Sequence, residues 1–176
     1  HLLDPHIWTD PNNAKVMVDN IVEALCELDE ENAAFYRKNA ETYKKQLDEL
    51  DREFRQVIEE GKRNKIVFGG RFALSYFVQR YDLDYVGAYE SCAANEDPSI
   101  KQISNIVEII KEEGIPVIYY EELVDPKVAN AIAEETGIMA LLLHSAHNVS
   151  KKELEDGVTY IELMKRNVEN LREGLR

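Results

Sequence analysis

Four short apolar runs alternate with helical patterns from Lys62 to the end of the chain. The runs lie at residues 66–68, 85–89, 116–120 and 139–143. A strand that returns to the same sheet through a helical crossover lies parallel to its neighbour, and such crossovers place helices on both faces. The pattern therefore predicts an α/β fold with a four-stranded parallel sheet covered by helices on both faces.

Two helical patterns precede this region. Residues 11–28 predict a helix with Asp10 as N-cap and Pro11 at the first helical position. Residues 29–60 predict a second helix, roughly 45 Å long at about 1.5 Å per residue. Its apolar positions alternate at spacings of four and three, so it could pair with a second copy as a coiled coil or span two lobes of one protein. The expected inward stripe of the first helix is Val16, Val18, Ile21, Val22 and Leu25.

Composition excludes one class of function. The 176 residues carry a formal net charge of −13 and show no basic face, whereas a nucleic-acid phosphate backbone requires one. We therefore expect no nucleic-acid partner. No apolar run is long enough to span a bilayer, and an opening at His1 without Met suggests a mature fragment or an excised domain. Cys26 is expected to be a small core residue, and Cys92 lacks the paired-cysteine spacing of a zinc site.

Polar residues follow each predicted strand. In parallel sheets, ligand sites lie at the carboxyl ends of the strands. Adjacent strand residues point to opposite faces, so only one of Glu121 and Glu122 can face such a site, and we favour Glu122, with a solvated acidic loop as an equal alternative. His144 is well placed there to bind a metal, although it could instead bond to backbone, and His147 could cap the following turn. The strand-end residues are Gly69, Gly70, Arg71, Glu90, Ser91, Cys92, Glu121, Glu122, His144 and His147.

His6 lies between two Asp-Pro turn signals, in the segment DPHIWTDP at residues 4–11. A histidine held at a structured loop end can offer a neutral imidazole to a metal. Two imidazoles and a carboxylate suit zinc, with manganese as the alternative. The sequence predicts a metal site of His6, His144 and Glu122, and no catalytic residue.

The segment at residues 4–11 resembles the Asp-Pro-His-x-Trp-x-Asp-Pro motif of the zinc/manganese-type metal-binding solute receptors of bacterial ABC transporters, in which the His is a ligand. Three further segments match that family, at residues 28–40, 73–81 and 160–171. The resemblance implies a monomeric, non-enzymatic receptor outside the cytoplasm, periplasmic or lipid-anchored, that passes zinc or manganese to a membrane permease. It implies a lobe-connecting loop and helix at 1–28, a long linking helix at 29–61 and a C-terminal α/β lobe at 62–176.

Three departures from the family pattern affect the expected site. The third ligand, usually His or Glu, falls on Arg71, which stays protonated and cannot ligate. The fourth, usually Asp, falls on His144, and Ser145 matches the Ser that often follows it. The first ligand comes from an N-terminal lobe that would precede this chain. The resemblance thus implies either a variant site or a receptor that has lost its original metal specificity.

Two other classes of function stay open. One is a metal-dependent hydrolase on an α/β sheet, but no His-Glu-x-x-His, Gly-x-Ser-x-Gly or phosphate-binding Gly-rich motif is found. The other is a non-metal interaction or adhesion module in which the long helix forms a dimer seam.

Overall fold

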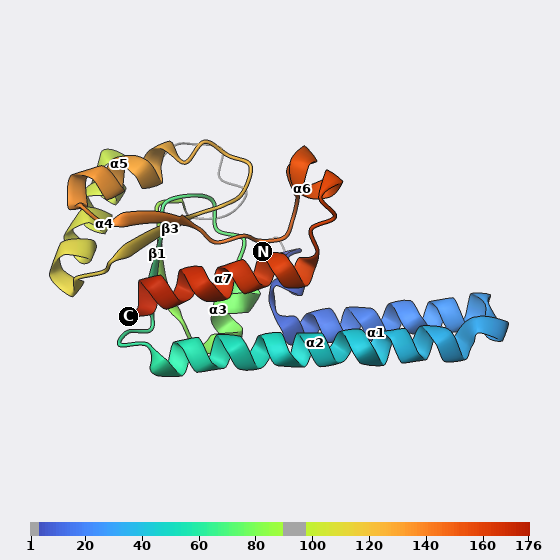
Figure 1. The fold of residues 1–176 in the computed structure, drawn as a ribbon. Helices are drawn as coiled ribbons and strands as arrows, with labels where there is room; N and C mark the ends of the chain where they lie inside the picture. Colours follow the sequence, from blue (N-terminus) through green and yellow to red (C-terminus); the bar gives the residue numbers. More distant parts are fainter. Residues whose placement is uncertain (1–3, 90–97) are drawn as a thin grey trace.

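The computed structural model describes residues 4–89 and 98–176 (Figure 1). Four parallel strands form one sheet in the order β2-β1-β3-β4. They are β1 (Lys65–Phe68), β2 (Asp84–Gly87), β3 (Val117–Tyr120) and β4 (Met139–Leu142). The chain adds β2 on one side of β1 and β3 on the other, so a topological switch point lies between β1 and β3. The predicted fold class is confirmed.

Helices cover both faces of this sheet, as the alternation of elements predicts. Side chains alternate along β1, so Phe68 joins one buried cluster with α2 and α7, while Val67 joins the other with α4 and α5. The helices of this region are α3 (Ser75–Tyr81), α4 (Ile100–Glu113), α5 (Lys127–Thr136), α6 (Lys151–Glu155) and α7 (Tyr160–Leu175).

Local sequence signals set the helix ends. Ser99, Ser150 and Thr159 form capping boxes that begin α4, α6 and α7. Gly114, at φ 62°, ends α4 in the left-handed conformation that glycine adopts without steric cost. The C-terminal stretch of the chain forms two helices, α6 and α7.

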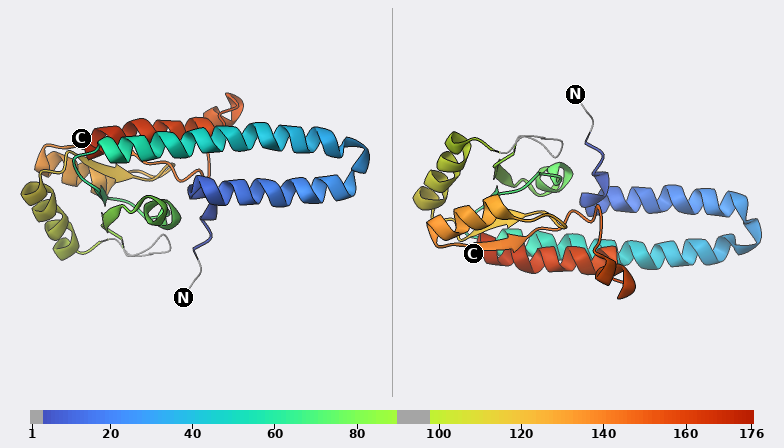
Figure 2. Two further views of the ribbon diagram at one scale, coloured as in Figure 1. Left: turned by 90° about the horizontal axis from the view of Figure 1, so that it is seen from below. Right: turned by 90° about the horizontal axis from the view of Figure 1, so that it is seen from above.

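Helices α1 (Pro11–Leu28) and α2 (Ala33–Glu60) run antiparallel (Figure 2). Helix α1 and the N-terminal part of α2 project from the α/β layers as an arm, while the C-terminal part of α2 lies along α7. Short 3₁₀ turns at Ile7–Thr9 and Glu30–Asn32 precede the two helices. The predicted boundaries fall close to the ends of α1 and α2, while the division of the chain into three units stays a prediction. The apolar positions of α2 that could have paired with a second copy as a coiled coil are buried within the single chain. The buried ones include Ala40, Leu47, Leu50, Phe54 and Val57.

The expected inward stripe of α1 is partly wrong. Val16 and Ile21 are each 57% exposed, whereas Ala14 and Cys26 are buried. Helix α1 packs along one neighbouring helix, α2. A single neighbour covers only a narrow strip of its surface, so part of its apolar stripe stays exposed. Among residues 4–89 and 98–176, no helix has both the length and the apolar character needed to cross a membrane.

Candidate metal centre

The loop before α1 holds His6 in one orientation. The Asp4 carboxylate accepts hydrogen bonds from the His6 backbone N–H at 2.9 Å and from Nδ1 at 2.7 Å. Because Nδ1 then carries the proton, Nε2 keeps its lone pair for a ligand, as in the carboxylate–histidine pairs of zinc proteins. Burial raises the pKa of Asp4, but hydrogen bonds from His6 and Ser75 outweigh it and hold the pKa below its ordinary value. Asp4 is therefore an ionised hydrogen-bond acceptor for the His6 ring.

Trp8 joins this loop to the loop after β4. Its indole Nε1–H donates to the Ser145 carbonyl at 2.9 Å, and the Tyr160 hydroxyl donates to the Trp8 carbonyl at 2.6 Å. The indole lies against both neighbouring imidazoles, with ring centroids 5.5 Å from His6 and 6.1 Å from His147. The His6 and His147 ring centroids are 5.2 Å apart. Two histidines from distant parts of the sequence thus lie side by side.

Glu122 holds the loop after β4 in place. Its carboxylate accepts hydrogen bonds from the Ser145 N–H at 2.9 Å, the Ser145 hydroxyl at 2.6 Å and the His147 N–H at 3.2 Å. Burial raises the pKa of Glu122, but the bonds from Ser145 and the nearby His144 lower it below its ordinary value. Glu121 lines the same cavity as Glu122, so the expectation that only one of them faces it is wrong: β3 ends at Tyr120, and strand alternation does not extend to the two glutamates.

His144 has a different environment from the other two imidazoles. It is 2% exposed, and its Nδ1 accepts a hydrogen bond from the Ala146 N–H at 2.9 Å. Its Nε2 is buried and has no hydrogen-bond partner within the described parts of the chain. The side chain of Asn167, on α7, bonds the backbone N–H and C=O of His144, each at 2.7 Å. The predicted role of His144 as a ligand stays a prediction, and its ring does not line the cavity described next.

An open cavity of about 410 Å³ lies between the two loops at the carboxyl edge of the sheet. Among the described residues, no three His, Cys, Asp or Glu side chains are grouped to hold a metal ion. Glu90 and Cys92 lie outside the described residues. The ionisable residues that line the cavity are His6, Arg71, Glu121, Glu122 and His147.

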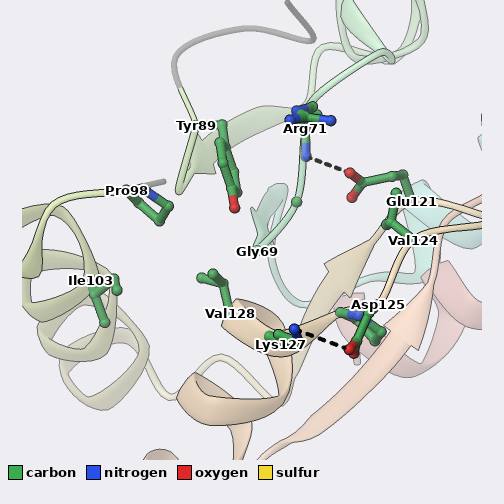
Figure 3. A pocket seen from close by; sticks show the side chains of 12 residues that line it. Gly69, Arg71, Tyr89, Pro98, Ile103, Glu121, Val124, Asp125, Lys127 and Val128 are labelled. Atoms are coloured by element: carbon green, nitrogen blue, oxygen red, sulfur yellow. Dashed lines mark hydrogen bonds and ion pairs between the residues drawn. The ribbon is translucent and has the colours of Figure 1, made fainter. Parts of the chain in front are cut away.

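A second cavity, of about 350 Å³, adjoins the first at Arg71 and Glu121, which line both (Figure 3). It lies at the switch point between β1 and β3. The Arg71 N–H donates to Glu121 Oε1 at 3.0 Å, and a Cβ on Gly70 would lie 1.5 Å from the other oxygen of this carboxylate. Glycine at position 70 thus lets the carboxylate approach the strand end. Lys127 and Asp125, 3.6 Å apart, lie at the far side of the cavity.

Residues 1–174 match the family model described as the periplasmic zinc-uptake complex component A, ZnuA. The chain belongs to this family. The predicted resemblance is therefore confirmed over nearly the whole sequence.

Named relatives of the ZnuA family resemble this chain over nearly all of its length. The high-affinity zinc uptake system protein ZnuA of Bacillus subtilis is 30% identical over 175 residues, covering 99% of the chain and 54% of the relative. The zinc-binding protein AdcA of Streptococcus pyogenes serotype M18 is 32% identical over 172 residues, covering 98% of the chain and 33% of the relative. The chain thus spans between one third and about half of these relatives.

Solved structures give the same fold. The metal-dependent lipoprotein YcdH of Bacillus subtilis superposes with a TM-score of 0.85 at 29% identity, covering 98% of this chain and 64% of that one. The laminin-binding protein Lbp of Streptococcus pyogenes gives 0.78 at 32% identity, covering 98% and 65%. The ZnuA-family lobe predicted from the sequence is therefore observed.

Of the predicted ligands, His6 and Glu122 line the first cavity and His144 does not, while the contacts of Asp4, Trp8 and Asn167 were not predicted. The motif at residues 4–11 contained a signal for Asp4, because a carboxylate two residues before a histidine can reach its Nδ1. Nothing local predicted Asn167, which reaches His144 from α7.

Proposed function

We propose that this chain is the metal-binding part of a receptor outside the cytoplasm, periplasmic or lipid-anchored, that binds zinc and delivers it to the permease of an ABC importer. The observation that carries the proposal is the adjacency of His6 and His147, with Asp4 orienting His6. The names of the relatives, which are zinc-binding and zinc-uptake proteins, support zinc as the cargo.

In this proposal, His6 Nε2 and the imidazole of His147 are the protein ligands. Zinc–nitrogen bonds of about 2.0 Å to two imidazoles in tetrahedral geometry place the ring centres roughly 5 Å apart. The observed 5.2 Å is compatible with such a pair. Imidazole donors favour zinc over manganese, which prefers oxygen ligands. Glu122 contributes negative charge and holds the His147 loop, and His144 supports that loop from below.

Binding and release would require no covalent chemistry. His6 is 6% exposed and fixed by Asp4, whereas the His147 side chain is exposed. Release would begin with displacement of His147, and acidification would favour release by protonating the imidazoles. The proposal also takes the protein to be a monomeric binding protein without enzymatic activity or a nucleic-acid partner.

Zinc titration by calorimetry tests the proposal, with manganese titrated in parallel. We expect His6→Ala and His147→Ala each to weaken zinc binding by tenfold or more, about 1.4 kcal/mol. His144→Ala is the matched comparison, because it removes the same side chain three residues away, and we expect it to lower stability but to leave zinc affinity within a few fold. Loss of affinity in His144→Ala with none in His147→Ala would reverse the ligand assignment.

A further inference from the structure

The loop before α1 is anchored by the α/β lobe, although it runs directly into the arm. On one side, the Tyr76 hydroxyl of α3 donates to the Asp4 carbonyl at 3.2 Å. On the other side, the loop after β4 and the first residue of α7 both hold Trp8. The hydrogen bonds that anchor residues 4–8 therefore come from elements that follow the arm in sequence.

Tyr160 is the first residue of α7 and has a fixed place in the lobe. The Thr159 capping box begins α7 directly before it, and its ring packs against the buried cluster that α2, β1 and α7 share. Burial raises the pKa of Tyr160, and Tyr43 and Asp10 raise it further, so the hydroxyl keeps its proton near neutral pH. Its 2.6 Å bond to the Trp8 carbonyl thus joins the loop before α1 to a firm base (Figure 1).

Trp8 transmits this anchorage to both imidazoles. Tyr160 holds its backbone, and the Ser145 carbonyl accepts a hydrogen bond from its indole Nε1–H at 2.9 Å. The rings of His6 and His147 lie against the indole, with centroids 5.5 and 6.1 Å from it. A side chain held at both ends separates the two loops by a set distance, so a shift of its backbone changes the separation of the imidazoles. Binding groups must be held within about 0.5 Å of their working geometry, so a small shift is enough to weaken binding.

We propose that Tyr160 is a positioning residue for metal binding, which fixes Trp8 and, through the indole, the separation of the two imidazoles. This inference rests on the proposed function and adds that the loop before α1 belongs mechanically to the α/β lobe. The sequence-based division instead groups this loop with α1, in a unit of residues 1–28. Tyr160 acts through Trp8 and is not itself a ligand, and the imidazole pair is assembled before a metal arrives.

Tyr160→Phe removes one hydroxyl and keeps the ring, so it tests this inference with little change in packing. We expect the zinc affinity of the whole protein, measured by calorimetry, to fall about three- to tenfold, the range expected for one neutral hydrogen bond. Trp8 is the only tryptophan in the chain, so we also expect its fluorescence emission to shift in the absence of metal. Cobalt(II) titrated in place of zinc should show a changed visible absorption band, which reports the geometry of its ligands.

Tyr119→Phe is the matched control, because its hydroxyl also donates to a backbone carbonyl of this lobe, that of Asn170 at 3.0 Å. It should lower thermal stability and leave the zinc affinity, the tryptophan emission and the cobalt band as in the parent protein. Tyr36→Phe loses a 2.6 Å bond to Asp29 at the turn between α1 and α2. It should also leave all three unchanged, since the imidazole pair does not depend on the arm.

Failure of this inference is distinct from failure of the proposed function. Zinc affinity in Tyr160→Phe equal to that of the parent protein would overturn the positioning role and leave the zinc receptor standing. An equal loss of affinity in Tyr119→Phe would overturn it too, because the effect would then be one of lobe stability. A parent protein that binds no zinc would overturn the proposed function and this inference with it. Thermal unfolding of each variant checks that it is folded at the temperature of the titration.

Discussion

At the scale of single residues, Asp4 decides which nitrogen of His6 faces the cavity. Its carboxylate oxygen accepts a hydrogen bond from His6 Nδ1, 2.7 Å away, so Asp4→Asn replaces a charged acceptor with a neutral amide. We expect zinc affinity to fall about 10- to 100-fold, the usual effect of removing a partner of a metal-bound histidine. Competition with a chromophoric zinc chelator measures this change.

The matched control for Asp4 is Asp48→Asn, which removes the carboxylate that pairs with Lys15 on the arm. This variant should keep the zinc affinity of the parent protein. Equal affinity in Asp4→Asn and the parent would show that His6 needs no carboxylate to present Nε2.

Asn167 is a second residue whose effect can be predicted. It is 2% exposed and bonds both backbone groups of His144, so Asn167→Ala leaves a buried N–H and a buried C=O without partners. Each such group costs about 1–3 kcal/mol, and we expect a loss of about 2 kcal/mol or more in the free energy of unfolding by urea.

Asn170→Ala is the comparison for Asn167, because it removes one bond, to the Leu142 carbonyl, at a half-buried position. It should cost less than Asn167→Ala. An equal cost for the two variants would mean that the loop after β4 does not depend on this amide.

The site could be predicted only in part from such residues. His6 stands in a motif that is readable along the chain, whereas strand alternation could not choose between Glu121 and Glu122, because both follow the last residue of β3. Whether the ring of His144 or that of His147 lines the cavity depends on how the loop after β4 turns. The contacts of Glu122 and Asn167 that hold this loop come from elements more than twenty residues away in sequence.

At the scale of elements, β1 and α5 approach so closely that Gly69 has no room for a side chain. A Cβ there would lie 2.7 Å from both Cα and Cβ of Ala129. We expect Gly69→Ala to lower the free energy of unfolding by about 1–3 kcal/mol, because strand and helix must separate. Urea denaturation measures this loss.

Gly87→Ala, at the end of β2, is the milder comparison, since the nearest atom to its Cβ would be the Tyr89 carbonyl oxygen at 3.1 Å. We expect a smaller loss of stability there. A neutral Gly69→Ala would show that α5 can move away from the sheet without cost.

Most elements were predictable because their signals are local. Apolar periodicity and the Asp10 N-cap lie within single elements, and they placed α1, α2 and the four strands within a few residues. The stripe of α1 was not predictable, because the number of neighbours that cover a helix is set by the rest of the fold. Val16 and Ile21 fit an apolar period and are nonetheless exposed.

At the scale of the whole molecule, three carboxylates make stability depend on pH. Burial opposes ionisation of Asp4, Asp51 and Glu122, but hydrogen bonds and neighbouring charges hold their pKa values below the ordinary range. A carboxylate whose pKa is lowered by folding adds stability at any pH above its ordinary pKa, which is 4.5 for Glu122. This stability is lost as the pH falls through the lowered pKa of the folded protein.

We therefore expect the melting temperature to be flat near neutral pH and to fall as pH drops below about 4.5. Glu122→Gln should melt lower than the parent protein at pH 7, because the amide lacks the stabilisation that the ionised carboxylate gives. The two melting temperatures should approach each other in acid, where the parent protein loses this stabilisation. Scanning calorimetry across pH measures both curves. Parallel curves for the two proteins would mean that the Glu122 carboxylate adds no pH-dependent stability.

The contact between Trp8 and Ser145 joins residues 137 positions apart. Closing so long a loop is slow and costly in entropy, so this contact can form only after the sheet and α7 have brought their ends together. A nascent chain that has not yet reached residue 147 has one imidazole loop and no second. Under the proposed function, metal capture by His6 and His147 would therefore follow the synthesis and folding of this part of the chain.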